Sequence, residues 1–562
     1  MTLVDHIRQS IIGRSQTATG PFGTHPVVYA DYTASGRALR FIEDYLSTMV
    51  LPGYANTHSE SSATGIQTSR FRREARRLVA SGVGATDEHA LLFCGSGATA
   101  AIDKIIGVLG LRIPSNLDDR HQLSHHVPGT ERPVVFIGPY EHHSNELPWR
   151  ESIADVRVIE EDCDGHLDLD RLEAELEQHR HRPLLIGSFS AASNVTGIKT
   201  DTYAVSSLLH RHGALAFWDF AAAAPYVDID MGRRADGPGY FDAIFVSPHK
   251  FIGGPGTPGL LVARRELFTN RVPTVPGGGT VTYVSPTDHH YIEGIEEREE
   301  GGTPDIIGSI RAGLVFQLKA AVGAAEIERR EEQLIARALE ALDAVPEIEI
   351  LGNQNAARLS IISFVVRCQA ELPDRTATPF LHHNFVVALL NDLFGIQARG
   401  GCSCAGPYGH RLLHIDRDSS LAFEREINRG CEGIKPGWVR VNFNYFIDDE
   451  TLDYIVGAIE LIARSGTALL PYYRFEPGTG LWHHRRGPVE PPHSLADIDY
   501  SLDVMDYERG RRALREVSLS DRLAETGERL AELIADRPEP LPRPDTNDDF
   551  ELLRWFPYPA EA

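Results

Sequence analysis

The stretch Ser247-Pro248-His249-Lys250-Phe251-Ile252-Gly253-Gly254-Pro255 follows four apolar residues, 243–246, which have the pattern of a buried strand. The strand thus delivers a lysine into a turn where Gly253 and Gly254 let the backbone come close to a bulky ligand. A lysine forms a Schiff base only when its amine can lose its proton near neutral pH, and burial or nearby cations lower its pKa toward that range. We interpret Lys250 as a candidate for a covalent link to a carbonyl compound, although an ordinary solvated loop can carry the same residues.

The composition is that of an ordinary globular chain. It has 562 residues, of which 42% are hydrophobic and 24% are charged, enough for a large core. The net charge of −24 argues against nucleic acid and against an anionic membrane surface as partners. No run approaches the ~18 apolar residues of a membrane span, and the first residues lack the apolar stretch of a signal peptide. Six cysteines are too few for a disulfide scaffold, so we expect a reducing, cytoplasmic environment.

Short apolar runs alternate with helical segments from residue 134 to residue 263. The runs are residues 134–137, 156–159, 184–186, 215–218, 243–246 and 260–262. Helices are expected between them, for example over 169–179 and 202–212. This alternation predicts an α/β domain with a mostly parallel sheet that is covered by helices on both faces.

Polar side chains follow these runs in succession. His142, Asn194 and Asp219 come after the runs that end at 137, 186 and 218, and Lys250 comes after the run that ends at 246. In open parallel sheets, ligands bind beyond the carboxyl ends of the strands. A loop histidine, a turn asparagine and a helix-capping aspartate explain single members of the set, but not four successive strands that end in this way. We therefore hypothesise that Lys250 carries pyridoxal phosphate as a Schiff base.

A second glycine turn supplies a candidate site for the phosphate. The apolar residues 91–93 lead into Cys94-Gly95-Ser96-Gly97-Ala98-Thr99, and an apolar helix is expected over 100–109. Exposed N–H groups at a helix start bind anions, helped by the helix dipole. The turn lacks the third glycine of a dinucleotide-binding fingerprint, so a phosphate monoester fits it better than a pyrophosphate. A plain tight turn is the alternative.

The loop Arg399-Gly400-Gly401-Cys402-Ser403-Cys404 has three interpretations. A metal site would need two more ligands, and His410 and His414 do not complete a common zinc spacing. A pair of structural thiols is the second interpretation. The third is a nucleophilic thiolate, which Arg399 would favour and the glycines would leave mobile. A sulfur nucleophile beside a cofactor that stabilises carbanions implies chemistry at the sulfur or selenium of a substrate.

Six motifs in this order resemble those of the class V aminotransferase superfamily, which consists of fold-type I pyridoxal-phosphate enzymes. They are residues 141–145, 193–197, 247–250, 302–304, 399–404 and 439–443. The resemblance covers residues 25–465 and is strongest to the cysteine desulfurase and selenocysteine lyase group. It implies a homodimer whose large domain has a mostly parallel seven-stranded sheet, followed by a smaller α/β domain. The residues after about 468 lie outside the typical fold of the family and are expected to form a C-terminal extension.

The resemblance also implies a role in catalysis for several matched residues. Lys250 would form the Schiff base and move the Cα proton of the substrate. Asp219 would keep the ring nitrogen protonated so that the ring accepts electrons, and His142 would stack on the ring and transfer protons. Arg440 would bind the α-carboxylate of the substrate with two hydrogen bonds. Cys404 would take up sulfur as a persulfide.

The remaining matched groups are assigned by the resemblance to binding. The cofactor would be held by Ala98, Thr99, Asn194, Ser247, His249 and, from a partner subunit, Thr303. The substrate would be bound by Asn194, Arg399 and Arg440. Three departures bear on the substrate more than on the cofactor. They are Ala222 in place of a glutamine, Cys402-Ser403 in place of two histidines, and Asp31-Tyr32-Thr33-Ala34 in place of Asp-Asn-Ala-Ala.

We therefore expect a cysteine desulfurase-like enzyme that breaks the C–S or C–Se bond of L-cysteine or a related amino acid and passes sulfur to an acceptor protein. An aminotransferase, a C–S lyase or an epimerase is the alternative with the same cofactor. A non-catalytic sulfur-relay or scaffold protein is the alternative without catalysis. The expected organisation is a segment 1–54 that joins the small domain, a large domain 55–325, a small domain 326–468 and an extension 469–562.

Segments outside the motifs carry weaker patterns. The arginines of a helix around 71–80 are interpreted as a solvated face, and residues 271–305 as a long loop at a domain or subunit edge. In the extension, one amphipathic helix is expected over 514–534. Residues 537–549 have the proline and aspartate content of a segment that is disordered or becomes ordered on docking.

Overall fold

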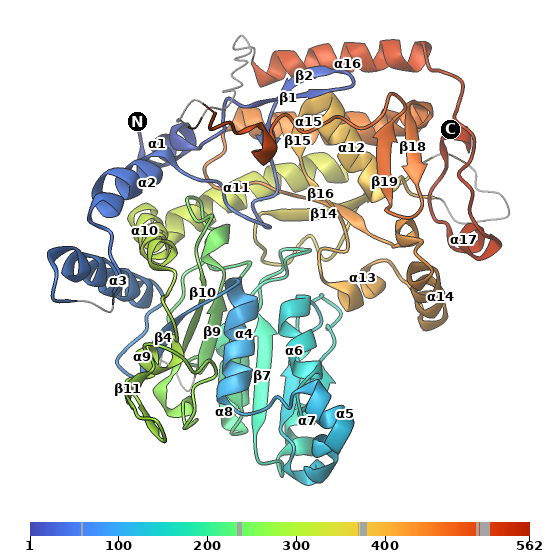
Figure 1. The fold of residues 1–562 in the computed structure, drawn as a ribbon. Helices are drawn as coiled ribbons and strands as arrows, with labels where there is room; N and C mark the ends of the chain where they lie inside the picture. Colours follow the sequence, from blue (N-terminus) through green and yellow to red (C-terminus); the bar gives the residue numbers. More distant parts are fainter. Residues whose placement is uncertain are drawn as a thin grey trace.

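The computed structural model describes residues 1–57, 60–232, 239–368, 370, 379–501, 505 and 518–561. A seven-stranded sheet fills the lower half of the molecule as drawn in Figure 1. In spatial order its strands are β4 (His89–Cys94), β10 (Gly259–Arg264), β9 (Ala243–Val246), β8 (Leu215–Asp219), β7 (Leu185–Ser190), β5 (Val134–Ile137) and β6 (Asp155–Val158). The last five run parallel, whereas β10 is antiparallel to both of its neighbours. The prediction of a mostly parallel seven-stranded sheet is confirmed.

Helices cover both faces of this sheet because its central strands are mostly apolar and are buried along their whole length. One face packs against α4 (Gly97–Val108) and α6 (Leu147–Arg150). The opposite face packs against α3 (Ala63–Gly82), α7 (Leu169–His179), α8 (Thr202–Arg211) and α10 (Ile306–Val322). The loops at the carboxyl ends of the strands are thereby left free to form a site.

A second sheet, with four antiparallel strands, lies above the first (Figure 1). Its order is β13 (Ile348–Ile350), β14 (Ile361–Val366), β17 (Trp438–Asn442) and β16 (Arg399–Gly401). Its core is completed by α11 (Ala324–Asp343), α12 (His383–Phe394) and α15 (Asp449–Ser465). N-terminal residues join this unit, since β3 (Val28–Tyr29) pairs with β15 (Ile396–Gln397).

The residues after α15 pack onto the same core. They form the hairpin β18 (Tyr473–Glu476) and β19 (Leu481–His484), then α16 (Leu519–Ala535) and α17 (Asp548–Leu553). Leu530, Phe550 and Phe556 are buried among the helices of the small sheet. Of the helix expected over 514–534, residues 514–517 lie outside the described residues. Residues 537–547 have no regular secondary structure and lead from α16 into α17.

The interpretation of the α3 arginines as a solvated face is wrong for two of them. Arg72 and Arg76 form ion pairs with Glu300, whose side chain is only 6% exposed. The same carboxylate accepts a hydrogen bond from the Phe93 N–H at 2.7 Å. Glu300 belongs to the segment expected as a long loop, which contains the hairpin β11 (Val281–Val284) and β12 (His289–Tyr291) and the short helix α9 (Ile295–Glu299). The paired charges attach this segment to the edge of the large sheet.

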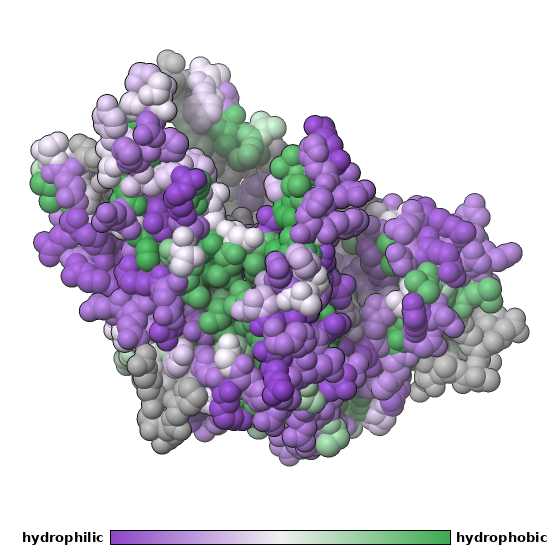
Figure 2. Space-filling view, turned by 90° about the horizontal axis from the view of Figure 1, so that it is seen from below, coloured by the Kyte–Doolittle hydropathy of each residue, from purple (hydrophilic) through white to green (hydrophobic). Residues whose placement is uncertain are grey.

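The surface has both charged and apolar regions. Seen from below, hydrophilic side chains surround an apolar area in the middle of the face (Figure 2). Among the large apolar side chains, Met49, Leu51, Tyr283 and Val284 are each more than half exposed. Among the described helices, no single one meets the length and hydropathy of a membrane span, and only the bent pair of α10 and α11 does so jointly.

Glu300→Gln tests the buried ion pairs, because it removes the anion that Arg72 and Arg76 share. We expect the free energy of unfolding to fall by about 3–5 kcal/mol, the usual loss when one partner of a buried ion pair is removed. Burial acts to raise the pKa of Glu300, but Arg76 and Arg72 lower it below its ordinary value. The stabilisation is therefore full above the ordinary glutamate pKa and is lost as the pH falls through the lowered value.

Urea unfolding measures this loss. The exposed neighbour Glu297→Gln is the matched control and should unfold like the wild type. A Glu300→Gln protein that loses less than about 1 kcal/mol, the range of an exposed ion pair, would show that the pairing is not a buried one.

Candidate active site

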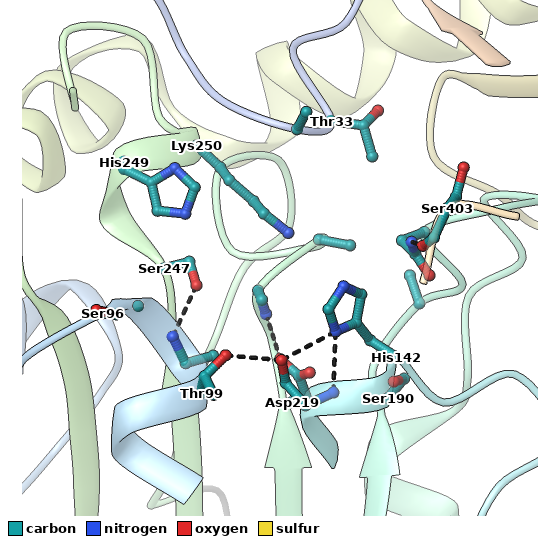
Figure 3. A pocket seen from close by; sticks show the side chains of 18 of the residues that line it. Thr33, Ser96, Thr99, His142, Ser190, Asp219, Ser247, His249, Lys250 and Ser403 are labelled. Atoms are coloured by element: carbon teal, nitrogen blue, oxygen red, sulfur yellow. Dashed lines mark hydrogen bonds between the residues drawn. The ribbon is translucent and has the colours of Figure 1, made fainter. Parts of the chain in front are cut away.

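A cavity of about 200 Å³ lies where the carboxyl ends of the parallel strands meet the small sheet (Figure 3). It gathers most of the residues that the sequence analysis selected. These are Ala98, Thr99, His142, Asn194, Asp219, Ser247, His249, Lys250, Arg399 and Arg440. Cys404 and Thr303 are not among its lining residues. Residues from distant parts of the sequence, from Ala98 to Arg440, thus meet in one place, as expected for a site at the strand ends.

Lys250 ends a short 3₁₀ turn, Pro248–Lys250, that directly follows β9, and its side chain extends into the cavity (Figure 3). The backbone turns back after it at Gly253, whose φ of +83° favours glycine. Burial is the largest influence on the amine and lowers its pKa to about 8; Asp219 acts to raise the pKa, and Arg440 acts to lower it. A fraction of the amine is therefore unprotonated near neutral pH, as a Schiff-base lysine requires.

Asp219 is the last residue of β8 and is 5% exposed. Its Oδ1 accepts a hydrogen bond from the Ala221 N–H at 2.8 Å. Burial raises the pKa of this carboxyl, while the Ala221 N–H and Lys250 act to lower it. A buried carboxylate is costly unless a cation or donors face it. The floor of the cavity is therefore suited to a ligand that brings a positive charge to Asp219.

The turn that the sequence analysis singled out for a phosphate forms the N-terminus of α4. Gly97 has a φ of +59°, and a Cβ atom placed there would lie 2.8 Å from Ser247 Oγ, so this position requires glycine. The Ala98 N–H donates to Ser247 Oγ at 2.8 Å, and Thr99 Oγ1 and Ser144 Oγ are 2.6 Å apart. Backbone N–H groups and hydroxyls thus converge at one end of the cavity, an arrangement that binds phosphate at helix starts.

Two histidines in the cavity are held neutral. His142 Nδ1 accepts the Ser144 N–H at 3.1 Å, so the neutral ring carries its proton on Nε2. Burial lowers the pKa of His142 to about 3, and Lys250 acts in the same direction. Burial likewise lowers the pKa of His249 to about 4. A neutral imidazole at 142 can stack on a flat ring without adding a charge to it.

Arg440 is buried on β17 and held from two sides. Its Nη2 pairs with Asp31 Oδ1 at 2.7 Å, and its Nη1 donates to the Asn194 carbonyl at 3.0 Å. Arg399 stands opposite it on the neighbouring strand β16. Asn194 Nδ2 donates to the Ser403 carbonyl at 2.8 Å, whereas its buried Oδ1 has no partner among the described residues. Two cations and an unsatisfied amide oxygen therefore line a region that a carboxylate and a hydrogen-bond donor would fit.

The cysteine loop continues from β16. Ser403 and Cys404 both have left-handed backbone conformations, with φ of 51° and 58°, which are uncommon for residues other than glycine. The His143 N–H donates to the Cys404 carbonyl at 2.8 Å and ties the loop to the segment that follows β5 of the large sheet. Cys402 packs against an apolar cluster that includes Trp438. The two cysteines therefore have different surroundings, and Ser403 between them lines the cavity.

Thr303, an expected site residue, does not line the cavity, and two residues that were not expected, Ser144 and Ser190, do line it. Thr303 is exposed, away from the cavity, and its Oγ1 accepts from Asn56 Nδ2 at 3.2 Å. Ser144 lines the cavity and lies inside the 141–145 motif, so the motif could have indicated it. Nothing in the sequence around Ser190, which also lines the cavity, sets it apart.

Within the described ranges, no three His, Cys, Asp or Glu side chains are grouped so that they could hold a metal ion.

Comparisons with known proteins agree with this geometry. The family model described as aminotransferase class-V matches residues 28–453. A cysteine desulfurase of Klebsiella pneumoniae is 30% identical over 386 residues, which cover 68% of this chain and 85% of the relative. A cysteine desulfurase of Shigella sonnei is 27% identical over 389 residues, with the same coverage.

Solved structures show the same fold. The apo cysteine desulfurase of Thermococcus onnurineus superposes with a TM-score of 0.63 at 23% identity, over 83% of this chain and 99% of that one. A cysteine desulfurase of Escherichia coli superposes with a TM-score of 0.60 at 20% identity, over 82% of this chain and 98% of that one. Because the family match spans most of the sequence and includes the whole cavity, the chain belongs to the aminotransferase class-V family.

Proposed function

We propose that this protein is a pyridoxal-phosphate enzyme that removes sulfur or selenium from L-cysteine or a related amino acid, by way of a persulfide on Cys404. The observation that carries the proposal is the position of Lys250, a buried amine with a pKa lowered to about 8 by its burial, in the same cavity as the Asp219 carboxylate. The names of the curated relatives, at 27% and 30% identity, support the choice of reaction.

The residues of the cavity fit pyridoxal phosphate. Lys250 would attach its aldehyde, Asp219 would face its ring nitrogen, and the unsatisfied Asn194 Oδ1 would accept from its ring hydroxyl. The phosphate would lie in the space that glycine at 97 leaves beside Ser247. When bound, pyridoxal phosphate supplies a ring that accepts the electrons of a bond broken at the substrate Cα.

The chain itself supplies proton transfer and orientation. Lys250 Nζ takes the proton from the substrate Cα, and its pKa near 8, due mainly to burial, suits a group that both accepts and returns a proton near neutral pH. His142, neutral and protonated on Nε2, is a second proton donor at the cavity floor. Arg440 binds the α-carboxylate with the N–H groups that Asp31 leaves free, and Arg399 adds a second cation.

Cys404 receives the sulfur. Its thiolate attacks the sulfur of the substrate, so that an S–S bond forms, the Cβ–S bond breaks and Cβ gains a proton. The products are alanine and a Cys404 persulfide, and no external oxidant is needed. Burial lowers the pKa of Arg440, and Cys404 is among the groups that act to raise it, so Cys404 lies near that guanidinium. Since Cys404 does not line the cavity, the loop must carry it forward during the reaction.

The proposed enzyme acts as a homodimer and passes its sulfur to an acceptor protein. Thr303 is exposed in this chain and would enter the cavity of a second copy. The exposed apolar side chains of Met49, Leu51, Tyr283 and Val284 support burial against such a copy.

An aminotransferase, a C–S lyase or an epimerase is the second candidate function. One observation favours it: Ser403 lines the cavity and Cys404 does not, which suits a loop with a structural role. The two candidates share Lys250 and Asp219 and differ in what Cys404 does.

Lys250→Ala should abolish the covalent adduct that borohydride leaves on the protein after incubation with pyridoxal phosphate. Mass spectrometry of the peptides locates the adduct. In the wild type, trapping should become more efficient from about pH 7 to 9, because the neutral fraction of an amine rises through its pKa. A scaffold protein without the cofactor would form no adduct at Lys250.

Lys319→Met is the matched control for this experiment. Burial also lowers the pKa of Lys319 to about 8, but its amine donates to the Val227 carbonyl and does not line the cavity. Its substitution should leave the adduct intact. An adduct found on Lys319, or one that persists in Lys250→Ala, would refute the assignment of Lys250.

Cys404→Ser separates the two candidate functions. We expect it to keep the adduct at Lys250 but to form alanine from L-cysteine about 10²-fold more slowly or worse, as when a nucleophile is removed. Cys402→Ser is the matched control and should retain the wild-type rate, because Cys402 packs into the apolar cluster. Unchanged alanine formation by Cys404→Ser, or a keto acid as the main product of the wild type, would favour the second candidate.

A further inference from the structure

The start of α12 lies between the C-terminal segment and the strand that leads into the cysteine loop. His383, the first residue of α12, is 6% exposed. The Trp555 ring stacks on it, with centroids 5.9 Å apart and planes at 26°, and on His382 at 5.2 Å and 15°. Trp555 Nε1 also donates to the Ile434 carbonyl at 3.1 Å. The tail after α17 is thereby fixed against the helix start, and Figure 1 shows the C-terminus ending beside β18 and β19.

His383 also lies close to the backbone of the strand that leads into the cysteine loop. A Cβ atom placed on Gly400 would lie 2.6 Å from Asn384 Oδ1 and 3.1 Å from His383 Nδ1. One placed on Gly437 would lie 2.7 Å from His383 Cδ2 and 2.8 Å from the Gly401 backbone. There is no room for a Cβ atom at either glycine, so His383 packs close to Gly400 of β16 and to Gly437, which in turn lies beside Gly401. A movement of His383 would therefore move Gly400 and Gly401.

A second link joins the extension to the same place. Asn384 Nδ2 donates to the Gly480 carbonyl, in the turn between β18 and β19, at 2.9 Å. Both Gly480 and Trp555 lie beyond residue 453, where the family match ends. The extension of this chain thus supports the helix start through two contacts that are independent of each other.

The loop that follows β16 needs such support. Ser403 and Cys404 have φ of 51° and 58°, and strained backbone conformations persist only where their surroundings hold them. Arg399 at the start of β16 lines the cavity, so a shift of the strand would displace a cavity cation together with the loop.

We propose that Trp555 is a positioning residue for the cysteine loop, acting through His383 on Gly400 and Gly401. Its effect on turnover rests on the proposed function, whereas its effect on the loop does not. A role in stability alone would change the unfolding of the protein but not the reactivity of Cys404 in the folded state.

The test measures how fast iodoacetamide alkylates Cys404 in the intact protein. It is done in a Cys402→Ser background, so that the peptide holds one thiol, and is read by mass spectrometry. The reaction is run at about pH 9.5, above the ordinary thiol pKa of about 8.5, so that differences in rate between variants report mainly access to the sulfur. There, Trp555→Ala should react faster by about threefold or more, the ratio expected when one aromatic contact is lost and the loop opens more often.

Three further variants make the result specific. Trp555→Phe keeps a stacked ring and should restore the wild-type rate. Leu552→Ala, on α17 with its residue 73% exposed, should leave the rate unchanged. If Trp555→Ala does not fold, Trp555→Leu keeps the apolar volume without the aromatic ring and carries the same expectation. A folded Ala or Leu variant that reacts at the wild-type rate would overturn the proposal, as would a Phe variant as reactive as the Ala variant.

The kinetics of turnover with L-cysteine provide a second measurement. In Trp555→Ala, kcat should fall about tenfold or more because the attacking sulfur is misplaced. KM should change less because Arg399 shifts with β16 but Arg440 on β17 still binds the α-carboxylate. Alkylation needs no turnover. A protein that never forms alanine would therefore refute the proposed function, and the alkylation rate of Cys404 would still decide the role of Trp555.

Discussion

Burial shifts the pKa values of the two charged groups at the floor of the cavity in opposite directions. It lowers the pKa of the Lys250 amine to about 8 and raises the pKa of the Asp219 carboxyl, and each group opposes the shift of the other through its charge. Both sit at the carboxyl ends of adjacent parallel strands, where the register places Asp219 opposite Phe245. The sheet therefore brings together an amine that can become neutral and a carboxylate that can hold a cation.

The rest of the molecule completes and closes this site. The small sheet supplies Arg399 and Arg440, and the N-terminal segment supplies Asp31, which is paired with Arg440 across 409 residues of sequence. The His143 N–H donates to the Cys404 carbonyl, so a residue that follows the large sheet also holds the loop that follows the small sheet. We infer that the cavity depends on the placement of the small sheet over the large one, and that the extension reaches this same region through His383.

The sequence predicted the features that depend on residues close to one another in the chain. Apolar runs of three or four residues indicated the strands, and the polar residues directly after them, such as Asp219 and Lys250, indicated the site. It did not predict pairings between distant segments. Arg72 is separated by 228 residues from Glu300, and Trp555 by 172 from His383, and no local pattern encodes which partner a side chain meets. The position of Cys404 outside the cavity lining has the same cause, since the loop is held both by β16 and by the distant residue His143.

The ionisation of the ring nitrogen tests the central claim most directly. The protein, loaded with pyridoxal phosphate labelled with ¹⁵N in the ring, is examined by NMR at neutral pH, and the chemical shift reports whether that nitrogen carries a proton. If the cofactor is joined to Lys250 with its ring facing Asp219, the nitrogen is protonated in the wild type and loses its proton in Asp219→Ala. A nitrogen that is unprotonated in the wild type, or unaffected by that substitution, would contradict the account.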